Sequence, residues 1–106
     1  MASVHLPHAG DAPFPSPDTR ARLHVQLAAY VHGPRTADVE RRVCAALGEL
    51  AREAHERRLY GEQMVLAVKS LWQDMPEVAV LADRREQQRL LGRLVTLCID
   101  AYYQHR

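Results

Sequence analysis

Apolar positions recur at helical spacing in four successive segments of the chain. Residues three and four apart share one face of a helix, so each segment would present one apolar face. We predict helices over about 17–32, 37–58, 62–74 and 83–104. No sustained two-residue alternation indicates a β-strand. Four helices on short connections predict an all-α fold, a small antiparallel four-helix bundle.

Residues at the ends of these segments support the proposed boundaries. Ser16 suits an N-cap and Pro17 the first position of a helix. Thr36 suits the N-cap of the second helix, and Asp83 with Glu86 has the spacing of a capping box before the last one. The helix starts are therefore encoded locally.

Two stretches fall outside the pattern. Residues 1–16 are rich in proline and have no apolar period, which predicts a flexible leader before a single helical domain over 17–106. Residues 77–82 fit either a short helical turn or an early start of the last helix.

The last segment carries the widest apolar surface of the chain. A surface helix needs an apolar stripe of about 100°, whereas here the apolar arc spans about 200°. One flank of a small bundle would not cover such an arc. We therefore predict that part of it contacts a second chain, most simply in a twofold dimer. The arc consists of Leu90, Leu91, Leu94, Val95, Leu97, Cys98, Ile99, Ala101 and Tyr102.

One edge of this arc is the candidate interaction surface. It comprises Leu91, Val95, Ile99 and Tyr102, with Tyr103 beside it. Tyr102 and Tyr103 point about 100° apart on a helix, which predicts that they do not share a contact. Because exposed tyrosine is enriched in interfaces, Tyr103 is the better candidate for a partner-facing ring.

The bulk properties narrow the class of protein. A chain of 106 residues can bury a core of its own. Its net charge of +1 gives no overall field that would attract nucleic acid or an anionic membrane. No run approaches the roughly 18 apolar residues of a membrane span, and no signal peptide is visible. We expect a cytoplasmic protein in which Cys44 and Cys98 are reduced.

The familiar catalytic and metal-binding patterns are missing from the sequence. There is no H-E-x-x-H, C-x-x-C, glycine-rich phosphate loop or G-x-S-x-G. His5 and His8 have the spacing of metal ligands but no further ligand nearby. We therefore predict no enzyme, no catalytic residue, no cofactor and no metal site.

His55 supports one alternative hypothesis. Ala54 and His55 are followed by Arg58 three residues after the histidine and by Gly61. This arrangement resembles histidine phosphotransfer domains, four-helix bundles with an exposed phospho-accepting histidine. The resemblance implies that His55 accepts the phosphoryl group. The family has a glycine four residues after its histidine, whereas Leu59 stands there in this chain.

A second alternative is weak nucleic-acid binding through the arginine-rich segments 41–42, 57–58 and 84–85. Acidic neighbours offset most of these charges, and the helix over 62–74 offers only Lys69 to phosphates or bases, so we do not expect a nucleic-acid partner. For Lys69 itself, two arrangements fit. Its stem could lie along the core with the ammonium in water, or it could pair with a carboxylate.

The leading hypothesis is a small, non-catalytic, intracellular helical protein with an interaction or regulatory role. It would act through apolar helix–helix contacts, as a homodimer or as a subunit of a larger assembly. The partner would be another protein or a second copy of the chain, with no membrane contact. The candidate edge on the last helix would carry the contact.

Overall fold

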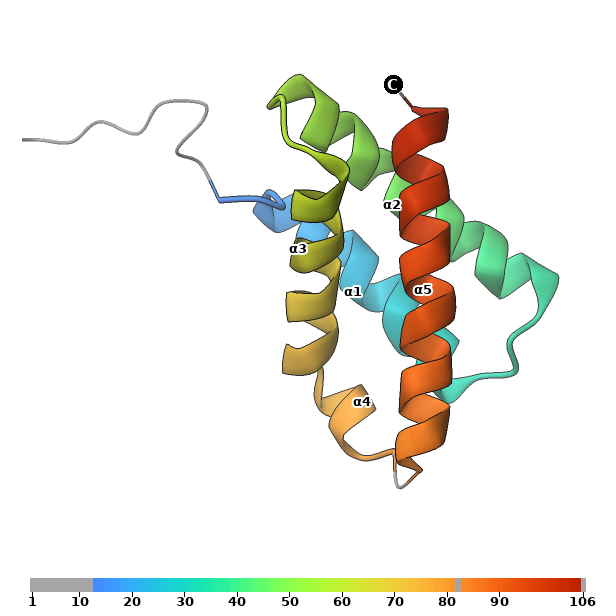
Figure 1. The fold of residues 1–106 in the computed structure, drawn as a ribbon. Helices are drawn as coiled ribbons and strands as arrows, with labels where there is room; N and C mark the ends of the chain where they lie inside the picture. The colour runs from blue at the N-terminus through green and yellow to red at the C-terminus, as the bar shows by residue number, and fades with distance from the viewer. Residues whose placement is uncertain (1–12, 82, 106) are drawn as a thin grey trace, which may run out of the picture.

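The structure is a computed structural model that describes residues 13–81 and 83–105. Its helices are α1 (Pro17–His32), α2 (Ala37–Glu56), α3 (Gly61–Asp74), α4 (Pro76–Ala79) and α5 (Arg84–Gln104). The described residues contain no strand, so the all-α prediction is confirmed (Figure 1). The four long helices lie within two residues of the predicted ranges. The ambiguous stretch 77–82 begins within the one-turn helix α4.

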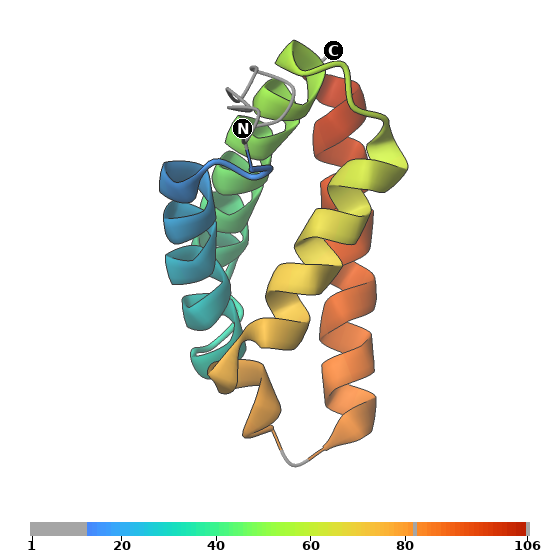
Figure 2. The ribbon, with the colours of Figure 1, turned by 90° about the vertical axis from the view of Figure 1, so that its left-hand side faces the viewer.

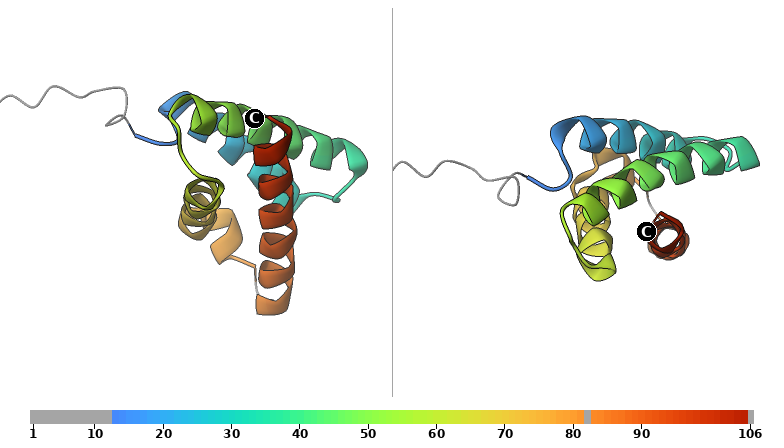
Figure 3. Two further views of the ribbon diagram at one scale, coloured as in Figure 1. Left: turned by 45° about the horizontal axis from the view of Figure 1, so that its top comes forward. Right: turned by 90° about the horizontal axis from the view of Figure 1, so that it is seen from above.

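The long helices form two antiparallel pairs that cross one another. α1 and α2 make one pair, and α3 and α5, connected through α4, make the other (Figure 2). Seen from above, α5 is viewed end-on while α1 and α2 lie across the view (Figure 3). α2 packs against both α1 and α5, and α3 packs against α5. One face of the α3–α5 pair is therefore covered, and its other face lies on the outside.

The buried face of α2 is built largely from small side chains. It comprises Val43, Ala46, Leu47, Gly48, Leu50, Ala51 and Ala54. Small residues let the neighbouring helices approach the α2 backbone closely. At Gly48, an added Cβ would lie 2.8 Å from Nε2 of His105, just beyond the end of α5. Fully buried leucines from the other helices, among them Leu27 and Leu94, fill the remaining core.

The beginning of the described chain is fixed to α2. The backbone N–H and the hydroxyl of Ser16 donate to the Glu53 carboxylate at 2.6 and 3.0 Å. Arg57 donates to the Pro13 carbonyl at 2.8 Å, and its guanidinium lies 5.5 Å from the centre of the Phe14 ring. Residues 1–12 of the predicted leader lie outside the described residues. Its last four residues pack against α2 because Glu53 and Arg57 bind them.

α2 ends at Glu56, two residues before the predicted boundary. Arg58 has a φ of 56°, a left-handed conformation that a side chain with a Cβ disfavours. The turn is closed by backbone hydrogen bonds from Leu59 N–H to the Ala54 carbonyl at 2.8 Å and from Arg58 N–H to the His55 carbonyl at 3.1 Å. Glycine usually occupies such a position after a helix. Here arginine occupies it, which is why the sequence places the end of the helix too late.

None of the helices in the described ranges is long and apolar enough to cross a membrane.

Replacing Arg58 by glycine should stabilise the protein. The substitution relieves the left-handed strain and should raise the free energy of unfolding by about 1 kcal/mol. Arg58→Ala removes the same guanidinium but keeps the Cβ, so it should not produce this gain. Urea denaturation followed by circular dichroism measures both variants. Equal effects of the two substitutions would contradict the assignment of strain to this backbone position.

Candidate interaction surface

The wide apolar arc of α5 is divided between the core and the surface. Its buried part comprises Leu90, Leu94, Leu97, Cys98 and Ala101. These residues face α2 and α3, which cover only one side of the helix. The remaining apolar residues lie toward the outer face of the α3–α5 pair.

That remaining edge, which we call the α5 strip, consists of Leu91, Val95, Ile99, Tyr102 and Tyr103. Ile99 is 42% exposed and Tyr103 is 59% exposed. The other three side chains are half-buried, and two of them, Leu91 and Tyr102, pack against the core. The strip is the same set of residues that the sequence singles out. The structure places these five residues side by side on one helix and leaves them partly open to solvent.

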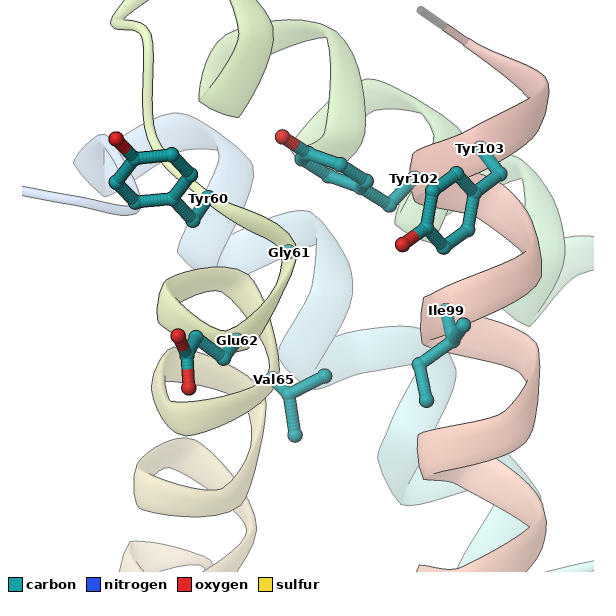
Figure 4. Close-up of a pocket in the computed structure, with 7 residues that line it drawn as sticks. All are labelled: Tyr60, Gly61, Glu62, Val65, Ile99, Tyr102 and Tyr103. Atoms are coloured by element: carbon teal, nitrogen blue, oxygen red, sulfur yellow. The ribbon is translucent and has the colours of Figure 1, made fainter.

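A groove of about 580 Å³ lies between the C-terminal end of the strip and the start of α3. It is lined by Tyr60, Gly61, Glu62, Val65, Ile99, Tyr102 and Tyr103 (Figure 4). In Figure 4 the side chains of Val65 and Ile99 point into the groove from opposite helices, and the hydroxyl of Tyr103 points across it. Tyr60 stands at the rim, 73% exposed. The groove extends the apolar strip from α5 onto α3.

Tyr102 holds the end of α5 against the α2–α3 connection. Its hydroxyl donates to the Leu59 carbonyl at 2.8 Å. Gly61 leaves room for the ring, because a Cβ there would lie 3.3 Å from Tyr102 Cδ1. Tyr103 meets Tyr102 edge to face, with ring centres 5.5 Å apart. The expectation that these two tyrosines do not share a contact is therefore wrong, because both rings lean toward the same groove.

His55 is engaged in the same anchoring contact. Its Nε2 donates to the Tyr102 carbonyl at 2.7 Å, and its ring stacks on the Tyr102 ring with centres 4.1 Å apart. The side chain is half-buried. A phospho-accepting histidine must present a free nitrogen to its partner protein. The geometry gives His55 a structural role and lends no support to the phosphotransfer hypothesis.

A second hollow lies at the opposite end of the strip. It measures about 290 Å³ and is lined by Trp72, Gln73, Val78, Ala79, Gln87, Gln88 and Leu91. Trp72 and Val78 are themselves buried, so the floor of this hollow is part of the core. Val95 lies on α5 between the two hollows. The outer face of the α3–α5 pair thus carries two depressions, one at each end.

Three arginines of the first two arginine-rich segments form ion pairs within the fold. Arg41 and Arg42 both pair with Asp38, at 3.0 and 3.1 Å. Arg57 lies 3.9 Å from Glu53. These pairs lie along α2, whose exposed side therefore carries alternating charges rather than a basic patch.

Three basic residues, Arg84, Arg85 and Lys69, differ from this pattern. Arg84 and Arg85, at the start of α5, are exposed and form no ion pair within residues 13–81 and 83–105. Lys69 is half-buried, and the described part of the chain offers it no ion pair either. The paired arrangement of Lys69 is therefore not found among the described residues.

The two cysteines have raised pKa values because their surroundings disfavour the thiolate. Burial raises the pKa of the Cys98 thiol to about 12. Burial, followed by the nearby Glu40 carboxylate, raises the pKa of Cys44, which is half-buried. No cluster of three or more histidine, cysteine, aspartate or glutamate side chains suited to a metal ion occurs in the described residues.

The α3 side of the groove is the part of the surface that the sequence does not predict. Tyr60 and Val65 join it only because α3 packs beside α5 in one particular rotation. The nearest signal in the sequence is Gly61 next to Tyr60, and the helical pattern indicates there only that one helix ends before the next begins. Comparisons of the chain with protein families, with curated proteins and with solved structures find no match.

Removing the Tyr102 hydroxyl should loosen the end of α5. Tyr102→Phe keeps the ring on His55 but leaves the Leu59 carbonyl without its donor, so we expect a loss of about 1 kcal/mol in the free energy of unfolding. Tyr60→Phe, which removes a hydroxyl from an exposed ring, is the matched control and should have little effect. Thermal unfolding of both variants measures this loss. Equal losses of stability in Tyr102→Phe and Tyr60→Phe would refute the anchoring role.

The buried thiol should resist labelling in the folded protein. With a pKa near 12, only about 10⁻⁴ of the Cys98 side chains would be thiolate at pH 8. A thiol-reactive reagent should therefore modify the more accessible Cys44 first and reach Cys98 only on unfolding. Mass spectrometry of labelled Cys44→Ser protein measures this directly. Rapid labelling of Cys98 in native Cys44→Ser protein would contradict the buried position.

Proposed function

We propose that this chain is a small, non-catalytic helical interaction protein that binds another protein chain through the α5 strip and the adjoining groove. It would act as a homodimer or as a subunit of a larger assembly. The observation that carries the proposal is the strip itself. Ile99 of the apolar arc and Tyr103 beside it remain exposed, while neighbouring residues of the arc are buried in the core.

The arrangement of the exposed apolar residues matters more than their number. Single exposed apolar residues are normal on a protein surface. Val25 on α1, Leu66 on α3 and Val80 just after α4 are of this kind. A contiguous apolar surface beside a groove is more typical of an interaction site. Here Ile99 and Tyr103 both belong to the strip and line the groove as well.

Helix burial supplies the energy for such binding. Each Å² of apolar surface removed from water contributes about 25 cal/mol, before the cost of association is subtracted. Tyrosine contributes a large contact area with few rotatable bonds, which favours it at interfaces. Tyr60 and Tyr103 at the groove are therefore well suited to contact a partner. A helix laid along the strip is the simplest partner that would cover both ends of the face.

Crosslinking from the strip tests this proposal without assuming the partner. A photo-reactive phenylalanine analogue placed at Ile99 in the full chain should give crosslinked protein in the cells that naturally make it. The same analogue at Val25, which is 64% exposed on α1, is the matched control and should give none.

A crosslink from position 99 to one defined protein, or to a second copy, would support the proposal. Equal yields from positions 99 and 25, or no product from position 99, would rule it out. Circular dichroism of the substituted proteins confirms that both remain folded.

A further inference from the structure

The connection between α2 and α3 divides the described chain into two halves. Helices α1 and α2 form one antiparallel pair, and α3 and α5, joined through α4, form the other (Figure 2). Each pair is made from one continuous stretch of chain, before or after residues 57–60. The halves pack through α2 against α5 and through α1 against α4. The halves of two different chains would make the same contacts if this connection opened.

The contact between the halves is largely apolar. A single core contains buried residues of both halves, among them Leu47 of α2 and Leu94 of α5, which are fully buried. A polar contact also crosses the boundary, because His24 Nε2 on α1 lies 3.2 Å from the Glu77 carboxylate on α4. Either half alone would expose this core to water. Each half therefore needs the other, whether it comes from the same chain or from a second copy.

The connection is strained in its closed form. Arg58 has a φ of 56°, which is disfavoured for any residue with a Cβ. Residues 57–60 are Arg-Arg-Leu-Tyr and contain neither glycine nor proline. Arginine and leucine are good helix formers, and the apolar pattern of the sequence continues the second helix to residue 58. The residues of the connection thus favour a helix, whereas the closed fold requires a turn.

We propose that two copies of the chain exchange halves, with α2 and α3 of each copy joined into one helix through residues 57–60. The α1–α2 pair of each copy then packs on the α3–α5 pair of the other. The contacts between halves that lie away from the connection are regained, and the strain at Arg58 is relieved in both copies. Short, strained hinges favour such an exchange. The inference goes beyond the proposed function, because this exchanged dimer does not use the α5 strip.

Hydrogen bonds at Leu59 hold the connection closed in the single chain. Its N–H donates to the Ala54 carbonyl at 2.8 Å, and its carbonyl accepts from the Tyr102 hydroxyl at 2.8 Å. In a continuous helix its N–H would donate to the His55 carbonyl and its carbonyl would accept from the Gln63 N–H. The backbone stays satisfied, but the bond to Tyr102 is lost and association costs entropy. We therefore expect exchange when chains refold together at high concentration.

Refolding at two concentrations tests the exchange. The full chain is unfolded in urea and refolded at micromolar or millimolar concentration, and size-exclusion chromatography with light scattering measures the dimer. We expect monomer from dilute refolding, and from concentrated refolding a dimer that persists on dilution. Arg58→Gly relaxes the closed turn and weakens the continuous helix, so it should lower the dimer yield about fivefold or more. Arg58→Ala, the matched control, keeps the Cβ and should not lower it.

A thiol bridge across the boundary identifies the exchange directly. Arg93 on α5 donates to Glu40 on α2 at 2.5 Å. Cysteines placed at these two positions in Cys44→Ser protein are joined with a short bifunctional thiol reagent. The bridge should be internal in the monomer and should link two chains in the dimer, as a denaturing gel shows. Internal bridges in the dimer, or a chain that refolds only to monomer at millimolar concentration, would overturn the inference.

The exchange and the proposed function fail in different ways. Ile99→Glu alters the strip and should leave the yield of exchanged dimer unchanged. A dimer that Ile99→Glu abolishes and Arg58→Gly leaves intact would overturn the exchange while supporting contact through the strip. Equal dimer yields from Arg58→Gly and Arg58→Ala would also overturn it. The photo-crosslinks from position 99 bear on the proposed function alone.

Discussion

The structure depends on how many sides of α5 the remaining helices can cover. Two antiparallel pairs that cross leave each long helix with neighbours on only part of its circumference. α2 reaches both α1 and α5 because small residues line its buried face, and Gly48 lets the end of α5 approach its backbone. That close packing fixes α5 against α2 on one side. The apolar arc of α5 is wider than this contact, so the rest of it lies on the outer face.

The packing of α5 against α2 also brings the C-terminal ends of these two helices together. Tyr102 and His55 join α5 to the end of α2, and the Tyr102 hydroxyl closes the contact with the α2–α3 connection. Because Arg58 turns the chain through a left-handed conformation, α3 can start within five residues of the end of α2. This turn sets the position of Tyr60 and hence one wall of the groove. The groove thus follows from the packing of the helix ends.

The sequence predicts the parts of the fold that are determined locally. The start of α2 lies where Thr36 accepts a hydrogen bond from the Val39 N–H at 3.2 Å, and α5 starts where the Asp83 carboxylate accepts from Arg85 N–H at 2.9 Å. Both signals act within a few residues. The end of α2 is harder to predict, because its left-handed residue is an arginine where a glycine would be the usual signal.

The candidate surface likewise has one part that the sequence predicts and one part that depends on helix packing. The α5 strip can be identified from the sequence, since an apolar arc on one helix is a property of that helix alone. Its continuation onto α3 cannot, because the rotation of α3 about its own axis depends on packing against α5 and α2. The side-chain directions of Tyr102 and Tyr103 show the limit of the helical-wheel argument. An ideal helix separates their Cα–Cβ directions, whereas their long rings bend toward one another and meet edge to face.

This meeting of the two rings gives the strip a property that exposed apolar residues often lack. The Tyr102 ring is held by its hydroxyl bond to Leu59, by the stack on His55 and by close packing against Gly61, so it has little freedom to move. Tyr103 rests its ring against this fixed neighbour and is held in place while staying exposed. A side chain that is already ordered loses less conformational entropy when a partner covers it. The packing of Tyr102 in the fold thus leaves Tyr103 both ordered and exposed.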